Sequence, residues 1–266
     1  MYKYKWVFTF LILSGVFGCK EDEKTKAPES PGIVQDSTAW IIEKTLEAHG
    51  SHLLNKSITE FDFRNDHFKV TRKGGSYSYE RTRTDSTGNQ LHDVLTNAVF
   101  YRERNGQRVE LTEKDSSSFS SSVNSVVYFA LLPYFLKDRA VRKTRLENVM
   151  LKGKPYFKIA VHFDQEGGGK DFEDEYVYWI HREHFTLDYL AYNYQDGAGP
   201  ETRGARFREA YGVRTVNGVR FADYRNFKPK AATELNIETF DQLFENEGME
   251  LLSLVELSNL KVHLLE

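Results

Sequence analysis

The sequence predicts a mainly β (α+β) fold, a curved antiparallel half-barrel with an N-terminal helix and a kinked hydrophobic helix on its concave side. The main reason is the stretch 155–194, which contains three consecutive antiparallel strands, the last two joined by a tight turn at 182–184. In the first of these strands Phe157, Ile159 and Val161 recur with a period of two, so they share one face that must be buried.

The third strand of this stretch is apolar on both faces. Leu187, Tyr189 and Ala191 are expected to point one way, and Leu190, Tyr192 and Tyr194 the other. Such a strand needs non-polar cover on both sides. A sheet covered on both sides, with few helices available, is expected to curl, and this predicts the half-barrel.

The N-terminus has the features of a secretory signal. Lys3 and Lys5 precede an apolar run, 6–18, which is too short to span a bilayer comfortably as a helix. The run ends at Cys19, the only cysteine in the chain, and resembles the lipobox of bacterial lipoproteins, although Phe17 is bulkier than usual at its position. The resemblance implies that residues 1–18 are removed and Cys19 is lipidated. A signal anchor and an ordinary secretory signal are the alternatives.

The residues after the signal predict a disordered tether. Residues 19–35 are charged, contain prolines and lack apolar periodicity. Their order of Cys, Lys and two acidic residues resembles the tag that sends lipoproteins to the cell surface in the Bacteroidota. We therefore expect a lipid anchor in the outer membrane, on either its periplasmic face or the cell surface. Residues 36–266 are then one domain, which suits an all-β fold of this length.

Charge and motifs narrow the function. The formal charge of the chain is −3, and removing the signal with Lys3 and Lys5 makes it −5, which argues against nucleic acid as a partner. The sequence has no HExxH arrangement, no nucleophile elbow, and no Gly-rich phosphate loop between a strand and a helix. We expect a monomer that needs no cofactor and no metal.

Residues 37–49 are expected to form the first helix, with Asp36 or Ser37 as its cap and Gly50 as its stop. Short strands should follow near 57–64, 67–73, 76–84, 90–96, 98–104 and 107–111. After a hydrophobic segment, further strands are expected near 141–151, 203–215, 218–228 and 249–265, with a short helix near 239–244.

The segment 123–136 is the most hydrophobic part of the mature chain. A helix here would be buried on most sides, and Pro133 should kink or split it. Two interpretations stay open. The helix is either part of the core or a lid that lies in the concavity of the curled sheet.

The order of elements over residues 36–265 resembles the LolA/LolB-like lipoprotein-localisation factors. In that family a curled antiparallel sheet surrounds an apolar cavity closed by helices, and the resemblance implies that acyl chains or other hydrophobic ligands bind inside. The chain also resembles an uncharacterised family of Bacteroidota lipoproteins, at 125–133, 167–171, 178–180, 188–192, 206–211 and 221–224. That second resemblance implies fold and location, and no activity.

The candidate ligand-binding residues of the cavity and lid are Val126, Phe129, Leu132, Tyr134, Trp179, Tyr189, Tyr192, Arg206 and Arg208. Arg206 and Arg208 lie on the same side of one strand and could hold a carboxylate or phosphate head group. Alternatively they pair with Asp188 and Asp223 across the sheet, with Glu209 also in reach. We favour this pairing, because a buried arginine requires partners with or without a ligand.

Acidic residues crowd the Gly-rich hairpin 162–175. Asp171, Glu173 and Glu175 share one strand face near His162, which could make a hard-cation or acid–base site. The calcium-loop pattern fails, because Tyr176 stands where a glycine is required. We therefore favour a solvated acidic hairpin with no metal.

The function that these observations favour is binding. The chain is expected to be an envelope-anchored lipoprotein that holds a lipid, an acyl chain or another amphipathic molecule in a half-barrel cavity. The alternatives are a hydrolase-type enzyme that uses the hairpin 162–175, and a structural lipoprotein of the cell surface.

Overall fold

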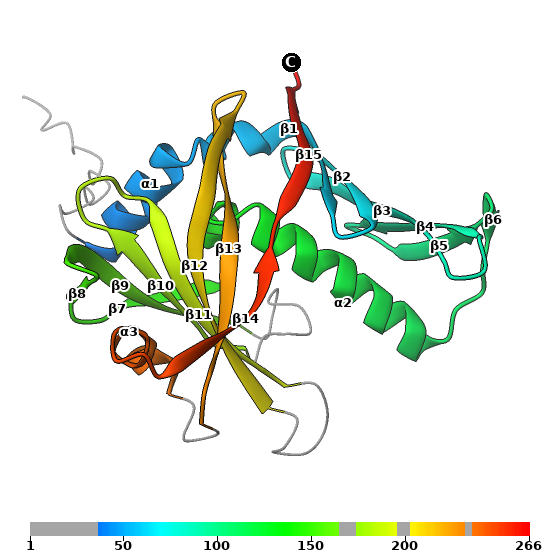
Figure 1. Cartoon of the computed structure of the whole chain (residues 1–266). Helices are drawn as coiled ribbons and strands as arrows, with labels where there is room; N and C mark the ends of the chain where they lie inside the picture. The colour runs from blue at the N-terminus through cyan, green and yellow to red at the C-terminus, as the bar shows by residue number, and fades with distance from the viewer. Residues whose placement is uncertain (1–36, 165–173, 196–202, 232–235) are drawn as a thin grey trace, which may run out of the picture. The chain divides into compact units, whose positions relative to one another are not determined.

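The computed structural model describes residues 37–164, 174–195, 203–231 and 236–266, and the strands among them form two antiparallel sheets (Figure 1). The first sheet contains β1 (Lys56–Phe63), β2 (Asp66–Lys73), β3 (Ser76–Thr84), β4 (Gln90–Thr96), β5 (Phe100–Arg104), β6 (Gln107–Arg108) and β15 (Leu257–Leu264). The second contains β7 (Val141–Arg145), β8 (Val149–Leu151), β9 (Lys154–Phe163), β10 (Tyr176–His181), β11 (Leu187–Gln195), β12 (Arg203–Val216), β13 (Val219–Pro229) and β14 (Met249–Val255). The predicted succession of strands is confirmed, except that β6 is shorter than expected and the strand expected at 141–151 is divided into β7 and β8.

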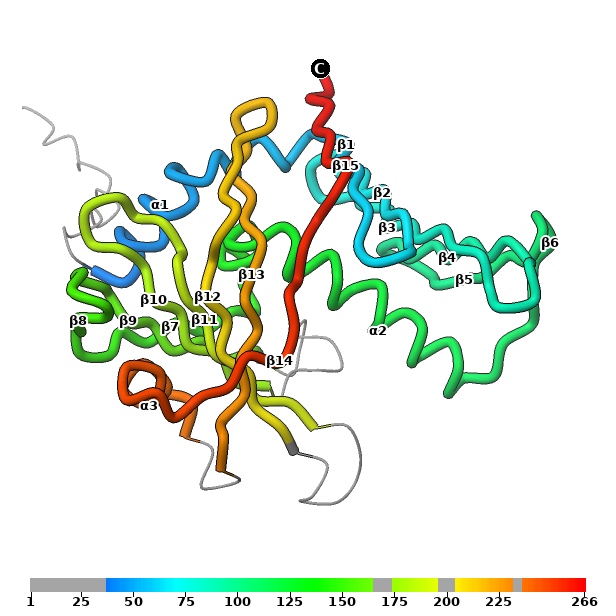
Figure 2. The backbone as a smooth tube through the Cα atoms, in the orientation of Figure 1, coloured from blue at the N-terminus to red at the C-terminus, as the bar shows by residue number. Residues whose placement is uncertain are grey.

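The C-terminal segment joins the two sheets. Strand β14 pairs with β13, and β15, which follows after Glu256, pairs with β1 (Figure 2). At the crossing the backbone of Leu257 bonds to side chains: its N–H donates to Asp223 Oδ1 at 2.9 Å, and its carbonyl accepts from Arg214 Nη2 at 2.6 Å. The sheets do not close into a barrel, and the predicted curved half-barrel is confirmed.

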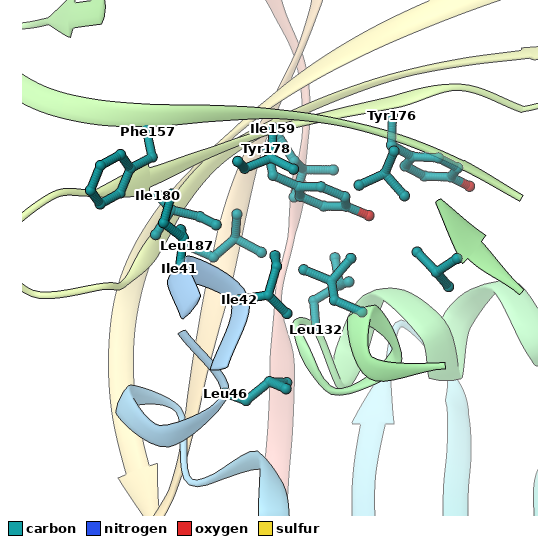
Figure 3. Packing of buried hydrophobic residues seen from close by; sticks show 14 of the residues in the cluster. Ile41, Ile42, Leu46, Leu132, Phe157, Ile159, Tyr176, Tyr178, Ile180 and Leu187 are labelled. Atoms are coloured by element: carbon teal, nitrogen blue, oxygen red, sulfur yellow. The ribbon is translucent and has the colours of Figure 1, made fainter. Parts of the chain in front are cut away.

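Helix α1 (Thr38–Ala48) begins at the predicted cap, where Ser37 Oγ accepts a hydrogen bond from the Trp40 N–H. It ends before Gly50, whose φ is +62° and whose missing side chain would meet the Gly218 carbonyl oxygen. Its apolar stripe packs on the inner face of β9 to β11, where Ile41 and Ile42 lie among Tyr178, Ile180 and Leu187 (Figure 3).

A bulge at Asp188 changes the direction of Leu187. Trp179 pairs with Tyr189 but Ile180 pairs with Leu187, so one residue of β11 is extra. Leu187 therefore lies with Leu190 on the inner face, while Tyr189 lies on the outer face. The expectation that Leu187 and Tyr189 point the same way is wrong, because strict alternation fails at a bulge.

The second sheet is apolar on both faces, as predicted. Its outer face, which carries Trp179 and Phe207, is covered by the 3₁₀ helix η4 (Ile237–Thr239) and the short helix α3 (Phe240–Glu245). The apolar outer face is thus core, and only the inner face is turned toward the concavity.

Helix α2 (Glu113–Ala130) begins earlier than predicted and includes the Ser-rich run 116–122. Within it only Val123 and Val127 are buried, so the prediction of a helix buried on most sides is wrong. The surface on which the helix packs is the reason that it is not buried. It lies on β3, β4 and β5 of the first sheet, which present charged side chains to it. The chain leaves the helix before Pro133, as predicted, and continues in the 3₁₀ helix η2 (Tyr134–Lys137).

The charged group beneath α2 is centred on Asp93, whose side chain is fully buried. Arg81 Nη2 and Arg102 Nε both donate to its carboxylate at 2.6 Å. Arg81 also donates to Ser122 Oγ at 2.9 Å, and the Arg102 guanidinium lies 3.6 Å from the centre of the Phe119 ring. Burial alone would raise the pKa of Asp93, but the hydrogen bonds and charges of Arg102 and Arg81 outweigh it and hold the pKa below its usual range.

Replacing Asp93 with Asn should destabilise the protein by about 3–5 kcal/mol, because two buried guanidinium groups would lose their shared counter-charge. Urea unfolding at pH 7 measures this, with Glu147→Gln as the control, since Glu147 is exposed. A loss no larger than that of the control would show that the group does not hold α2.

His49 links α1 to the bulge. Its Nδ1 donates to the Thr45 carbonyl at 2.8 Å, and its Nε2 accepts from the Leu187 N–H at 3.4 Å. Burial, opposed by the hydrogen bond to Thr45 and assisted by the charge of Arg220, lowers the pKa of His49 to about 4. The ring is therefore neutral in the folded protein at neutral pH.

The free energy of unfolding should fall as the pH drops from about 6.5 to about 4, because the unfolded histidine takes up a proton in this window and the folded one does not. The loss from this residue is at most about 3 kcal/mol. Urea unfolding at several pH values should show a steeper dependence in the wild type than in His49→Gln. Equal slopes would contradict the assignment.

Candidate binding cavity

A cavity of about 510 Å³ lies between the C-terminal half of α2 and the inner face of the second sheet, and we call it the α2 cavity. It is lined by Phe63, Arg64, Ser125, Val126, Phe129, Ala130, Tyr192, Arg206, Arg208, Ala222, Tyr224, Asn226, Leu252, Ser253, Val255 and Leu257. The lining comes from α2, from β11 to β14, from the end of β1 with the residue after it, and from the start of β15, so the place where the two sheets meet forms one wall.

The helical wall follows from the spacing of residues in α2. Val126, Phe129 and Ala130 stand three and four positions apart, so they share a side of the helix. The Phe129 ring lies 5.0 Å from that of Tyr192, centre to centre. Because α2 rests on the first sheet, it leaves this side only half-covered by the second.

Three arginines line the α2 cavity, Arg64, Arg206 and Arg208, and Arg208 is the most buried of them, at only 8% exposed. Its guanidinium carbon lies 4.0 Å from the centre of the Phe129 ring, and its Nη2 donates to the Tyr192 hydroxyl at 2.9 Å. Its Nε and Nη1 are buried without a hydrogen-bond partner among the residues that the structure describes. Such a buried cation lowers the stability of the fold, because it has lost its hydration and, within the described chain, only one hydrogen bond from Nη2 replaces it.

The carboxylates expected to pair with Arg208 bind other cations. Asp223 lies 3.0 Å from Arg214, and Glu209 lies 3.0 Å from Lys152. Asp188 accepts from the Tyr156 hydroxyl at 3.1 Å, with Arg220 at 3.9 Å. The favoured interpretation of a structural ion pair is therefore wrong for Arg208. Its strand alternates, so Arg208 points inward while the neighbouring Glu209 points to the opposite face.

Arg206 lies nearer the start of β12, two residues before Arg208, and also lines the α2 cavity. It is half-buried, its Nη1 donates to the Ala205 carbonyl at 2.8 Å, and its guanidinium lies 5.0 Å from the Tyr194 ring. It is thus on the same side of the strand as Arg208 but is better solvated.

The structure divides the predicted ligand residues into two groups. Those that line the α2 cavity are Val126, Phe129, Tyr192, Arg206 and Arg208. Leu132 is buried against α1, and Tyr134 accepts a hydrogen bond from Arg72 Nε at 2.9 Å in the core near the first sheet. Trp179 and Tyr189 lie on the outer face with Phe240 of α3. These four do not line the cavity, because they follow the end of α2 or face outward from the sheet.

Sequence reasoning missed the wall formed by β13. Ala222, Tyr224 and Asn226 all line the α2 cavity and stand at alternate positions of one strand. The period of two could have identified them once Asn217 and Gly218 had placed the hairpin.

The hairpin 162–175, for which acid–base chemistry was the alternative to a solvated acidic hairpin, is partly described. His162 Nδ1 lies 4.0 Å from Glu175 Oε1, and both side chains are about half exposed. Asp171 and Glu173 lie outside the described residues. The hydrolase hypothesis therefore stays a prediction. The described part of this hairpin does not line the α2 cavity.

A second polar group lies in the turn between β10 and β11. His181, Glu183 and His184 bring ligand atoms within 4.8 Å of one another. The Nδ1 of His181, however, accepts the backbone N–H groups of Glu183 at 3.2 Å and His184 at 3.4 Å. The histidine rings stack with centres 4.6 Å apart, and the Nδ1 of His181 is engaged in stabilising the turn.

No helix in the described part of the chain is both long enough and apolar enough to cross a bilayer. Cys19 and the tether 19–35 lie outside the described residues, so the anchor stays a prediction.

The sequence profile of a family of unknown function, DUF6503, matches residues 34–257, and the chain belongs to this family. A search of curated proteins finds no match. Among solved structures, the chain is similar to an outer membrane lipoprotein-sorting protein domain from Vibrio parahaemolyticus, with 10% identity over 84% of this chain and 92% of that chain and a TM-score of 0.42.

Two further structures are similar. One is a DUF1329 family protein from Desulfovibrio piger, with 8% identity over 83% of this chain and 91% of that chain and a TM-score of 0.38. The other is the lipoprotein LppX of Mycobacterium tuberculosis, with 9% identity over 59% of this chain and 90% of that chain and a TM-score of 0.28. These scores are low, and nothing about function follows from them.

Proposed function

We propose that this member of the DUF6503 family is an envelope-anchored lipoprotein that binds a hydrophobic or amphipathic small molecule, a lipid or an acyl chain, in the α2 cavity. The observation that carries the proposal is the cavity itself. Its volume falls within the range of about 300–1,000 Å³ that is usual for small-molecule sites, and non-polar side chains form much of its wall.

The position of α2 supports this function, because it explains why the concavity is not filled. The Ser-rich half of the helix is held by the charged group around Asp93, on the first sheet. Phe129 then reaches the second sheet through Tyr192 and Tyr176, at ring distances of 5.0 and 6.3 Å, and through the Arg208 guanidinium at 4.0 Å. A core helix would pack fully against the apolar inner face of the second sheet. Helix α2 packs on the first sheet and covers only part of that inner face.

Exposed leucines of β14 lie next to the α2 cavity. Leu251, Leu252 and Leu254 of β14 are 54%, 45% and 51% exposed, and Leu252 also lines the cavity. Exposed leucines next to an apolar cavity are typical of surfaces that hydrophobic ligands cross.

The anchor completes the proposal. Lipidation of Cys19, followed by the tether 19–35, would hold one LolA-like domain as a monomer at the outer membrane of a member of the Bacteroidota, on its periplasmic face or at the cell surface. A ligand taken from a membrane would then meet the cavity without a long path through water.

The first test is extraction. Delipidated protein rebound to a fluorescent fatty acid, and native-host protein examined by mass spectrometry, should both show a bound lipid. Extracts that are repeatedly empty, together with no uptake of the fluorescent probe, would reject the proposal and favour a structural lipoprotein.

A matched pair of substitutions locates the site. Ser125 and Ser118 are both exposed on α2, but only Ser125 lines the cavity. Ser125→Trp should fill the entrance and weaken binding of the fluorescent fatty acid at least about tenfold, a change of about 1.4 kcal/mol. Ser118→Trp should bind as the wild type does. Equal affinity of both variants would place the ligand elsewhere.

A further inference from the structure

The guanidinium of Arg208 has fewer polar partners than the other buried cations of the described chain. Arg81 and Arg102 share Asp93, and Lys158 Nζ lies 3.0 Å from Asp241. Arg72 donates to the hydroxyls of Tyr134 and Tyr79. Arg208 has one hydroxyl partner, and two of its nitrogens have none among the described residues.

Nothing that lines the α2 cavity neutralises this charge. Burial raises the pKa of Tyr224 to about 12, although Arg208 and Arg220 act to lower it, so its hydroxyl is neutral at pH 7. Asn226, which faces Arg208 in the strand register, is neutral, and its Oδ1 is also buried without a partner in the described chain. The site thus offers free donors from a cation and one free acceptor beside a non-polar wall.

The orientation of the guanidinium is fixed without the ligand. The Phe129 ring covers it at 4.0 Å and keeps water away, while the Tyr192 hydroxyl holds Nη2. Nε and Nη1 are buried without a partner in the described chain, so a ligand oxyanion that displaces the groups covering them would satisfy both, and hydrogen bonds from guanidinium to an oxyanion are among the strongest in proteins.

We propose, on the premise that the α2 cavity binds an amphiphile, that its ligand carries a carboxylate that binds Arg208, with its chain along Phe129 and Val126. Carboxylate and phosphate share the chemistry that a guanidinium recognises. A carboxylate carries one negative charge and neutralises Arg208, which is the buried one of the three arginines that line the cavity. A phosphate monoester carries about 1.5–2 and would also need the half-buried Arg206 or the exposed Arg64 for balance. The one-to-one balance favours the carboxylate.

The experiment compares three ligands with the same chain: oleic acid, oleyl alcohol and oleoyl lysophosphatidic acid. Calorimetric titration of the delipidated protein at pH 7.5 should show oleic acid bound at least about tenfold more tightly than oleyl alcohol. Arg208→Met should abolish this preference while keeping affinity for the alcohol. Arg104→Met, which removes one exposed charge far from the cavity, should retain the preference.

The outcomes separate the two proposals. If the wild type binds none of the three ligands, the proposed function itself fails. If acid and alcohol bind equally and Arg208→Met changes neither, the cavity binds lipid but the carboxylate assignment is overturned. Tighter binding of the lysophosphatidic acid than of oleic acid would overturn it in favour of a phosphate head group.

Unfolding in urea distinguishes a binding role from a structural one. Ligand-free Arg208→Met should unfold at the same or a higher urea concentration than the wild type, because it removes an uncompensated buried charge. Arg208→Lys should keep part of the preference for the acid, since it retains the charge and loses the forked geometry. A lower midpoint in Arg208→Met, with weaker binding of the alcohol as well, would show that Arg208 supports the fold.

Discussion

The position of α2 depends on the buried carboxylate of Asp93, which is shared by Arg81 and Arg102. Two cations around one anion leave a net positive charge beneath α2, which the Ser122 hydroxyl stabilises as a hydrogen-bond acceptor and the face of the Phe119 ring by a cation–π contact. A Ser-rich segment with few apolar residues is therefore held firmly as the first half of a helix. The second half then extends over the concavity, and the α2 cavity lies beneath it.

The α2 cavity does not arise in the way that the two-sided apolar strands predicted. Strands that are apolar on both faces suggested a sheet curled around a ligand, but the outer face is covered by α3 and η4. The space for a ligand results instead from the way the two sheets meet. Arg214 and Asp223 bond to the backbone of Leu257 at this crossing, where β14 leaves one sheet and β15 enters the other.

Arg208 and Asp93 show two ways of burying charge in one fold. At Asp93 each group has partners of opposite charge, and the result is structural. At Arg208 the strand alternation turns the nearby Glu209 to the other face, where Lys152 and Arg225 bind it. A buried cation without a counter-charge lowers the free energy of unfolding. Proteins commonly tolerate such a loss of stability at sites where ligands bind.

The sequence by itself determined most elements of the fold. The period of two gave the strands, Ser37 and Gly50 bounded the first helix, and Pro133 marked the end of the second, because these signals act within a few residues. It also grouped Val126, Phe129, Tyr192, Arg206 and Arg208 as candidate ligand residues, and these five line the α2 cavity. Only the tertiary structure decided the bulge at Asp188, the outward direction of Trp179 and Tyr189, and the lack of a counter-charge for Arg208. These depend on which strands lie side by side and in what register, and no local pattern encodes that.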